Sequence, residues 1–336
     1  MSTATRTGLV LGKFMPLHRG HLELIRFAQA YCDRLIVLVG VSAGEPIPGP
    51  LRRQWVEQEL AGQPGIEVHY MDEEMPQSAV ASRMVSKAWA EYLAHRFPEL
   101  AVIFTSEAYG AYVAEYMGID YVDFDPPRQQ VPISATLIRE APFNYWDFIP
   151  QAVRPYFVKK ICLYGPESTG KSVLSEQLAR HFHTAYVPEM ARFVIGSSLD
   201  CTYEDMTAIA EAQAAAIQKT LPAANKLLFC DSDLLTTKVY SEYLFGRTPA
   251  FAPWVEAANR YDLHLFLEAD VPYVQDGTRL GAATRPVLRA AFLAALQAAG
   301  VPYAVVSGAS WEHRFRQAVG LVEQHFGVSA APLVSP

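Results

Sequence analysis

The sequence predicts an α/β protein made of two domains, each built on a parallel β-sheet. Three observations lead to this prediction. The chain has 336 residues, more than the roughly 100–200 that a single domain usually contains. Short apolar runs alternate with amphipathic stretches, which is typical of βαβ units. A glycine-bearing loop between a strand and a helix occurs twice, near the N-terminus and again near the middle of the chain.

The first series of elements occupies about 140 residues. A continuous apolar run, RLIVLVGVS at 34–42, suits a strand that is buried on both faces. The segment ISATLIRE begins like a helix, with Ser134 as the expected N-cap. Strands are expected at 8–14, 34–42, 66–72, 101–107 and 119–125, and helices at 21–32, 51–62 and 82–97.

The two domains are expected to join near Pro155. The connection at 141–158 contains aromatic residues and prolines rather than glycine and serine, so we expect it to be packed. A second series begins at 159 with a strand, a glycine loop and a helix. We therefore expect domains at 1–155 and 156–330, with an alanine-rich helix at 290–299.

Composition narrows the class of protein. A formal net charge of -7 disfavours sequence-independent nucleic-acid binding, which needs clustered Lys and Arg. The four cysteines are far apart and form neither a zinc-ribbon pattern nor a disulfide framework. No signal segment and no apolar stretch of about 20 residues is present. We expect a cytoplasmic protein without nucleic-acid or membrane partners. The oligomeric state stays open, and a homo-oligomer is compatible with the sequence.

The segment GPESTGKS matches the phosphate-binding pattern G-x-x-x-x-G-K-[ST] and lies between a predicted strand and a predicted helix. Glycines let successive backbone N–H groups face phosphate oxygens, and the helix N-terminus favours negative charge. Lys171 adds positive charge near the β- and γ-phosphates, and the Ser172 hydroxyl can bind Mg²⁺. The sequence therefore predicts an ATP site formed by Gly165, Glu167, Ser168, Thr169, Gly170, Lys171 and Ser172.

Three acids are candidates for catalysis near this loop. Asp231 ends an apolar run, and Asp233 lies two residues later, on the same face of an extended segment. Either can order Mg²⁺ or accept the proton of an attacking hydroxyl, although both can instead cap the next helix. Glu189 and Arg192 follow another strand and are expected near the loop. We predict Ser172 and Asp231 at the metal, and leave open whether Glu189 or Asp233 is the base.

The polar segment at 276–285 carries two arginines and two glycines. As a mobile flap it would bring Arg279 and Arg285 over the transferring phosphoryl group and stabilise its charge. The alternative is a surface loop with solvated arginines.

The N-terminal loop GKFMPLHRGH places His18 and His21 on one side of a first helical turn. Both can donate hydrogen bonds to phosphate oxygens beside the helix N-terminus. A metal site would need a third ligand, and none is nearby in sequence. We predict a second nucleotide site here, with Gly12 and Phe14 shaping the loop.

This loop resembles the [HT]-x-G-H signature of the nucleotidylyltransferases, and ISATLIR at 133–139 resembles their second motif, I-S-x-T-x-[IL]-R. The resemblance implies that His18, His21, Ser134 and Arg139 bind ATP phosphates and stabilise the transition state at the α-phosphorus. It also implies that Thr136 supports the turn. Lys13, at the mouth of the loop, is expected to be a further phosphate contact.

With a P-loop kinase behind the transferase, nearly the whole chain resembles the bifunctional NadR-type family. The likeness includes TSEAYG, VPEMAR, CDSDLLTT and the DG-x-R segment. It implies a Rossmann-like nucleotidyltransferase followed by a P-loop kinase. The kinase would convert nicotinamide riboside and ATP to nicotinamide mononucleotide (NMN) and ADP. The transferase would then join NMN to the AMP part of ATP, giving NAD and pyrophosphate, with Mg²⁺ at both sites. Many members carry an N-terminal helix-turn-helix domain, and we expect transcriptional repression to be absent here.

Aromatic residues are candidates for binding the cationic nicotinamide ring. We predict Trp89 in the transferase, and Trp254 and Trp311 in the kinase, although each can equally be a core tryptophan. Two other functions stay open. In one, only the kinase is efficient; in the other, the chain is an ATP-binding sensor of nicotinamide nucleotides with little turnover.

Overall fold

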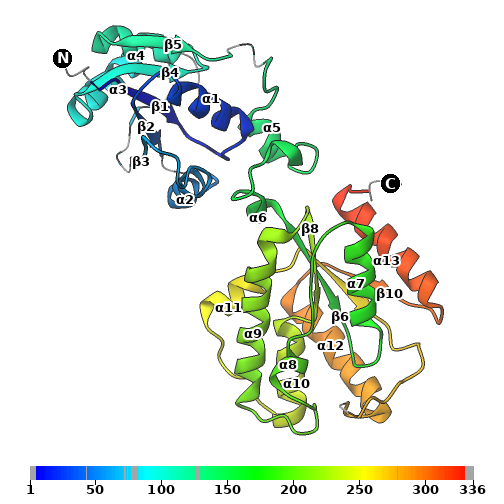
Figure 1. Cartoon of the computed structure of the whole chain (residues 1–336). Coiled ribbons are helices and arrows are strands. Elements are labelled where there is room, and N and C mark those ends of the chain that lie inside the picture. The colour runs from blue at the N-terminus through cyan, green and yellow to red at the C-terminus, as the bar shows by residue number, and fades with distance from the viewer. Residues whose placement is uncertain are drawn as a thin grey trace. The chain divides into compact units, whose positions relative to one another are not determined.

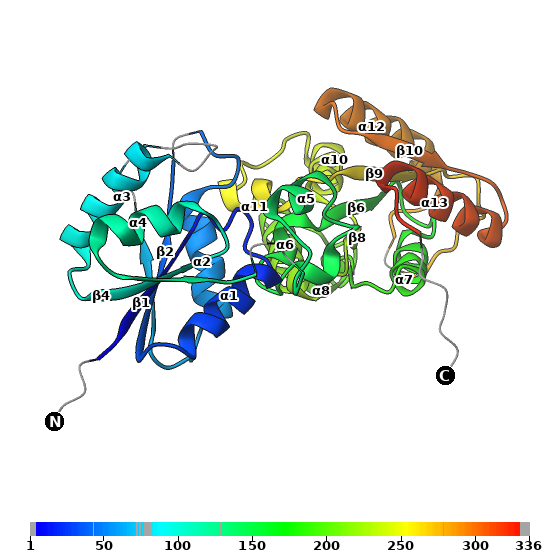
Figure 2. The same ribbon diagram turned by 90° about the horizontal axis from the view of Figure 1, so that it is seen from above.

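The computed structural model describes residues 5–42, 44–71, 73, 75–76, 82–125, 127, 129–277 and 279–329. The chain divides into two compact units, Met1–Arg154 and Pro155–Pro336, called unit 1 and unit 2 below. Each unit has a five-stranded sheet in which all paired strands are parallel. Helices cover both faces of each sheet (Figures 1 and 2). The predicted fold class is confirmed.

The sheet of unit 1 has the order β3-β2-β1-β4-β5, so β1 lies at its centre. The strands are β1 (Thr7–Gly12), β2 (Arg34–Val39), β3 (Ile66–Tyr70), β4 (Leu100–Thr105) and β5 (Asp120–Asp123). The helices are α1 (Arg19–Gln29), α2 (Gly49–Glu59), α3 (Arg83–Arg96), α4 (Tyr109–Met117), α5 (Ala135–Glu140) and the 3-10 turn η1 (Trp146–Phe148).

The elements of unit 1 follow the expected order, and most of their bounds differ from the expected ones by a few residues. The helix α4 is not among the predicted elements, and β1 ends at Gly12, so residues 13 and 14 belong to the loop. Five consecutive residues of β2 are buried, as its continuous apolar run predicts. Ser134 caps α5 by accepting a hydrogen bond from the Leu137 N–H at 3.3 Å, which confirms the predicted N-cap.

The sheet of unit 2 has the order β10-β9-β6-β8-β7, so β6 lies at its centre. The strands are β6 (Lys159–Tyr164), β7 (Tyr186–Val187), β8 (Leu227–Asp231), β9 (Leu263–Leu267) and β10 (Tyr303–Val306). The helices are α6 (Arg154–Phe157), α7 (Lys171–His181), α8 (Ala191–Val194), α9 (Asp205–Thr220), α10 (Leu234–Phe245), α11 (Pro253–Ala258), α12 (Arg285–Ala299) and α13 (Trp311–Phe326), with 3-10 turns η2 (Leu221–Ala223) and η3 (Ala282–Thr284).

The carboxyl ends of the parallel strands position the candidate sites of both units. Ligands of open α/β sheets bind in the crevice outside these ends. The loop after β1 contains the two histidines, and the loop after β6 is GPESTGKS. None of the helices among the described residues is both long enough and apolar enough to cross a membrane.

Candidate active sites

His18 and His21 face each other where α1 begins. Their rings stack with centroids 3.7 Å apart and an interplanar angle of 19°. The main-chain N–H of His18 donates to Nδ1 of the His21 ring at 3.3 Å, and the His18 ring accepts from the main-chain N–H of His21, so each ring helps to cap the helix. Phe14 supports the pair, with its ring edge-on to His21 at 4.9 Å between centroids. The two imidazoles thus lie at the N-terminus of α1, where an anion is favoured.

The loop before α1 is tightly packed at its start. A Cβ on Gly12 would lie 3.0 Å from the Phe14 ring, and Phe14 itself has a φ of 48°. Arg52 of α2, a fully buried arginine, binds the main chain of this loop. Its guanidinium donates to the carbonyls of Lys13 and Gly40. Sequence patterns gave no indication of Arg52, because its partners are the Glu45 carboxylate and main-chain carbonyls of loops outside α2.

Arg139 joins the second motif to this loop. Its guanidinium donates to the Met15 carbonyl and, at 3.1 Å, to the Thr136 hydroxyl. Ser134 and Thr136 therefore act in the local structure of α5, as N-cap and as acceptor for Arg139. The structure thus brings the two predicted motifs together.

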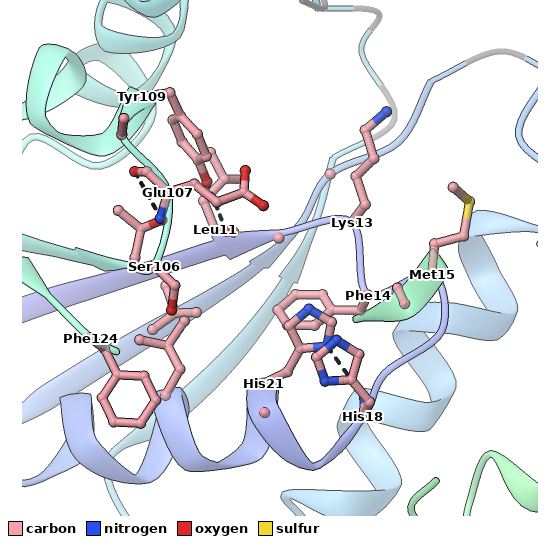
Figure 3. Close-up of a pocket in the computed structure, with 18 of the residues that line it drawn as sticks. Leu11, Lys13, Phe14, Met15, His18, His21, Ser106, Glu107, Tyr109 and Phe124 are labelled. Atoms are coloured by element: carbon pink, nitrogen blue, oxygen red, sulfur yellow. Dashed lines mark hydrogen bonds between the residues drawn. The ribbon is translucent and has the colours of Figure 1, made fainter. Parts of the chain in front are cut away.

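A cavity of about 660 Å³ opens over the carboxyl end of the unit 1 sheet. Trp89 lines it and is 9% exposed. Across the pocket from the histidines lie Glu107 and Tyr109 (Figure 3). The Tyr109 hydroxyl donates to the Leu11 carbonyl at 3.1 Å, and burial raises its pKa well above the usual range. Of the residues predicted for this site, those that line the cavity are Gly12, Lys13, Phe14, His18, His21, Trp89 and Arg139.

Lys13 forms an ion pair with Glu45 at 2.8 Å, and Glu45 also accepts from Arg52. Burial acts to raise the pKa of Glu45. The hydrogen bonds from Lys13 and from the Ser42 N–H, together with the positive charge of Arg52, outweigh this effect, so the pKa of Glu45 lies below its usual value. The lysine is 45% exposed at its side chain and lines the cavity. Its ammonium group is thus held at the mouth of the pocket.

In unit 2 the GPESTGKS loop has the geometry of a phosphate cradle. Gly165, Ser168 and Gly170 all have positive φ, at 137°, 60° and 88°. A Cβ on Gly165 would lie 2.8 Å from the Leu267 carbonyl oxygen, so only glycine fits there. Lys171 folds over the loop and donates to the Pro166 carbonyl at 3.0 Å, and the Thr169 hydroxyl donates to the same carbonyl at 2.9 Å.

A buried carboxylate lies beside this loop. Asp231 ends β8 and is 1% exposed, and among the described residues neither of its carboxylate oxygens makes a hydrogen bond of normal geometry. Burial and the nearby Glu189 carboxylate raise its pKa to about 6, although Lys171 and the Ser172 hydroxyl act in the opposite direction. Glu189 in turn pairs with Arg192 at 2.9 Å. The structure therefore gathers the predicted acids Glu189 and Asp231 around Lys171.

A residue that the sequence did not point to holds these two acids in place. Gln213, on α9, is buried and accepts a hydrogen bond from the Met190 N–H at 2.9 Å. Its amide group donates to the carbonyls of Asp231 and Ser232 at 3.4 and 3.5 Å. One side chain thus connects the loop that carries Glu189 with the end of β8. A glutamine inside an alanine-rich helix was the signal available in the sequence.

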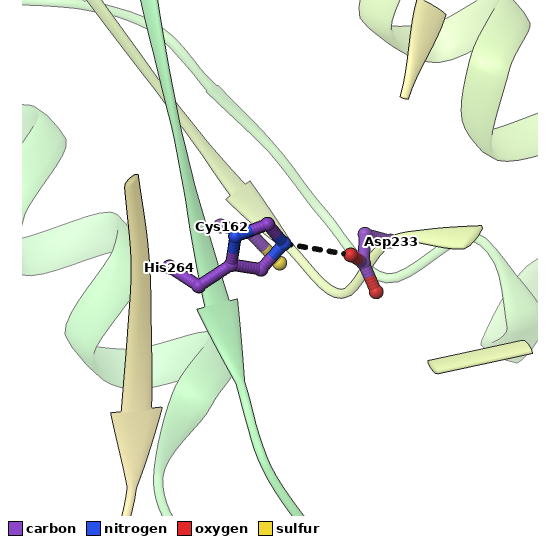
Figure 4. Close-up of side chains that lie close together, drawn as sticks. All are labelled: Cys162, Asp233 and His264. Atoms are coloured by element: carbon purple, nitrogen blue, oxygen red, sulfur yellow. Dashed lines mark hydrogen bonds and ion pairs between the residues drawn. The ribbon is translucent and has the colours of Figure 1, made fainter. Parts of the chain in front are cut away.

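The prediction that Asp233 shares a face with Asp231 is wrong. Ser232 between them has a φ of 75°, so the chain turns and alternation stops. Asp233 instead caps α10, accepting from the Thr236 N–H at 2.8 Å, and bonds to His264 at 2.9 Å (Figure 4). Cys162 completes a buried group whose ligand atoms lie within 4.8 Å of one another. Both carboxylate oxygens of Asp233 already have partners, so we assign this group a structural role.

The segment at 276–285 lies against the phosphate loop. The Ser168 hydroxyl accepts from the Val274 N–H at 2.8 Å, and Glu167 accepts from the Leu280 N–H at 3.0 Å. Burial raises the pKa of Glu167. Arg279 pairs with Asp276 at 2.8 Å, and Asp276 lies 3.8 Å from Arg192. The polar segment therefore contacts both the loop and the acid cluster. Thr278 lies outside the described residues.

The prediction that Arg285 belongs to this flap is wrong. Arg285 is the first residue of α12, is 8% exposed, and donates to the carbonyls of Val271 and Ser168 at 2.9 and 3.5 Å. Its side chain therefore helps to hold the main chain of the phosphate loop in place.

The two tryptophans predicted for unit 2 lie in different parts of it. Trp311 lies against Gly170, whereas Trp254 is on α11, which packs against α9.

Comparison with known proteins gives a consistent picture. An AAA domain model matches residues 160–314. The chain is 32% identical to the trifunctional NAD biosynthesis/regulator protein NadR of Escherichia coli (strain K12), covering 95% of this chain and 83% of the relative. It is 23% identical to the nicotinamide-nucleotide adenylyltransferase of Thermococcus onnurineus (strain NA1), covering 46% of this chain and 83% of that protein.

Solved structures share the architecture. A NadR protein in complex with NR superimposes with a TM-score of 0.79 at 21% identity, covering 99% of both chains. A NadR protein in complex with NAD and AMP-PNP gives the same TM-score and identity, covering 98% of this chain and 99% of that one. At this level of identity the two structures establish the shared fold.

Proposed function

This chain belongs to the NadR family of NAD biosynthesis proteins, and on that premise we propose that it is a bifunctional NAD salvage enzyme. Its P-loop unit phosphorylates nicotinamide riboside with ATP, giving NMN and ADP. Its other unit adenylylates NMN with a second ATP, giving NAD and pyrophosphate. The domains assigned to these activities are residues 156–330 and 1–155.

One observation carries this proposal: each unit has its own candidate phosphate-binding loop at the carboxyl end of its own sheet. In unit 1 the loop leads to His18 and His21, and Arg139 of the second motif contacts it. In unit 2 the loop contains Lys171 and lies beside the buried Asp231. Two separate loops suit two ATP-consuming steps better than a single reaction.

In the kinase step, the riboside 5′-oxygen attacks the γ-phosphorus, and the bond from that phosphorus to the bridging oxygen of ADP breaks. The hydroxyl proton passes to a carboxylate within hydrogen-bond reach, for which we propose Glu189, the more exposed of the two acids. Lys171 neutralises charge on the β- and γ-phosphates. We propose that Arg192 and Arg279, joined through Asp276, help to bind substrate and phosphate.

The environment of Asp231 fits a bound Mg²⁺. The buried carboxylate of Asp231, beside the Ser172 hydroxyl and the Lys171 ammonium group, offers the oxygen ligands that this ion prefers. We propose that Ser172 and Asp231 hold it, directly or through water. When bound, Mg²⁺ supplies charge neutralisation for the phosphates.

In the transferase step, a phosphate oxygen of NMN attacks the α-phosphorus of ATP, and pyrophosphate leaves. No covalent intermediate on the protein is needed, because the reaction requires alignment and charge neutralisation. We propose that His18, His21 and Arg139 donate to the phosphate oxygens, with Lys13 at the mouth of the pocket. Trp89 is proposed to stack on the nicotinamide ring.

The proposed setting is the cytoplasm, with small molecules as partners. Cys32, Cys162, Cys201 and Cys230 are all free thiols, which suits a reducing compartment.

A product analysis tests the function. The protein is incubated with ATP, Mg²⁺ and nicotinamide riboside, and the products are separated by chromatography. The proposal predicts NMN, then NAD, with ADP and pyrophosphate released. If NMN accumulates without NAD, and if no NAD forms when NMN and ATP are supplied directly, then only the kinase works. Binding of the nucleotides without any product would favour the sensor.

A further inference from the structure

Trp311 lies directly over the last glycine of the unit 2 phosphate loop. A Cβ built on Gly170 would lie 2.4 Å from Cζ3 and 3.0 Å from Cη2 of the indole, closer than carbon atoms approach. The indole therefore packs on the bare backbone of Gly170. Yet Trp311 is 55% exposed. Part of this ring covers the loop while the rest remains open to a ligand.

The Trp311 ring is fixed against Gly170 by the position of α13, which begins at this residue. One turn further along α13, the guanidinium of Arg314 donates to the Thr169 carbonyl at 3.0 Å and to the Glu268 carbonyl at 2.7 Å. Arg314 is 1% exposed, and its guanidinium carbon lies 5.7 Å from the centroid of the Trp311 ring. The start of α13 is thus fixed to the phosphate loop and to the end of β9.

The order of the strands places the acids and Trp311 on opposite sides of the central strand of unit 2. The acids Glu189 and Asp231 follow β7 and β8, on one side of the central β6. Trp311 follows β10, on the other side. In-line transfer requires the γ-phosphate to face the acceptor and its base. The nucleoside must then extend away from the acids, across the N-terminus of α7, toward Trp311.

We infer that Trp311 is the platform on which the adenine of the kinase's ATP stacks. This assigns the indole to the nucleotide donor and removes it from the candidates for the nicotinamide ring. Stacking of a base on an aromatic side chain is worth about 1–3 kcal/mol by alanine substitution. The inference rests on the proposed kinase function for the identity of the donor, and its test does not require turnover.

The test compares ADP with inorganic tripolyphosphate, which can occupy the loop but has no base. Binding is measured by titration calorimetry in a His21→Ala background, which weakens the competing site of unit 1. Trp311→Ala should weaken ADP binding by roughly 5- to 150-fold, the stated stacking energy converted to affinity. Its affinity for tripolyphosphate should stay unchanged. Trp311→Phe should retain most of the ADP affinity, and Tyr303→Ala, an exposed aromatic of β10, serves as the matched control.

Two results would overturn the inference. An equal loss for ADP and tripolyphosphate would mean that Trp311 only supports the loop. Unchanged ADP binding with a raised KM for the riboside would place the indole at the nicotinamide instead. Weakened ADP binding in a protein that phosphorylates no riboside would refute the proposed kinase and leave the adenine platform standing.

Discussion

Gln213 and Asp231 are joined by a hydrogen bond from the glutamine amide to the aspartate's own carbonyl, at 3.4 Å. The same glutamine accepts from the Met190 N–H, next to Glu189. The relative position of the two acids in unit 2 therefore depends on a side chain from α9 that is itself far from the phosphate loop in sequence.

Replacing Gln213 by Ala should lower kinase kcat by roughly tenfold, because a misplacement of the acids removes alignment more than affinity. Loss of the buried bonds should also cost about 1–3 kcal/mol of unfolding free energy. Steady-state kinetics and urea unfolding measure both effects. Gln218→Ala, an exposed glutamine on the same helix, is the control. A wild-type kcat in folded Gln213→Ala would show that the glutamine only stabilises the fold.

Asp231 should make unit 2 less stable as pH rises. Its pKa in the folded protein is about 6, above the ordinary value of 3.8, so the folded state binds more protons between these values. Stability is therefore lost as pH rises from about 4 to 6, and the cost, on the order of 2–3 kcal/mol, is fully present above that range.

Asp231→Asn should accordingly raise the melting temperature of unit 2 at pH 8, and by less at pH 5, while lowering kinase activity. Calorimetric melts at both pH values measure the difference, with the exposed Asp200→Asn as control. The same gain at pH 5 and pH 8 would contradict the raised pKa.

The two acids should differ in their response to Mg²⁺. Asp231→Asn should change the Mg²⁺ concentration needed for half-maximal kinase rate, because Asp231 is proposed to hold the ion. Glu189→Gln should lower kcat and leave that concentration unchanged, as expected for loss of the base. Initial rates over a Mg²⁺ series separate the roles. An identical, unaltered Mg²⁺ response in both variants would refute the assignment.

His21→Ala should lower adenylyl transfer by a factor on the order of 10²–10³, the scale of removing one transition-state donor. Kinase rates should stay within a few-fold, because the histidine lies in unit 1. Coupled assays of NAD formation from NMN and of NMN formation from riboside measure each rate. His69→Ala, on β3 of the same unit, is the control. Unchanged adenylyl transfer would make His21 a structural histidine.

The features that could be predicted from the sequence are those that depend on residues close together in the chain. The phosphate loop of unit 2 and the histidine loop of unit 1 each lie within one strand–loop–helix segment, so their candidate residues could be predicted from motifs in the sequence. The N-cap at Ser134 is local in the same sense.

What could not be predicted depends on backbone turns and on distant segments. Ser232 has a left-handed backbone conformation, which turns Asp233 away from Asp231, and nothing in the sequence CDSD predicts this turn. Arg285 begins a helix, and its partners are main-chain carbonyls that carry no sequence signal. Gln213 and Tyr109 reach their sites from helices whose positions only the folded sheets define.

The central claim is that two independent sites act in series, and a mixing experiment tests it most directly. Lys171→Ala should convert NMN to NAD but form no NMN from riboside, and His21→Ala should do the reverse. Each variant alone, given riboside and ATP, should therefore make little NAD. An equimolar mixture of the two folded variants should make NAD from riboside at a rate well above the sum of the separate rates. Loss of both activities in either folded variant, or no recovery of NAD in the mixture, would contradict the account.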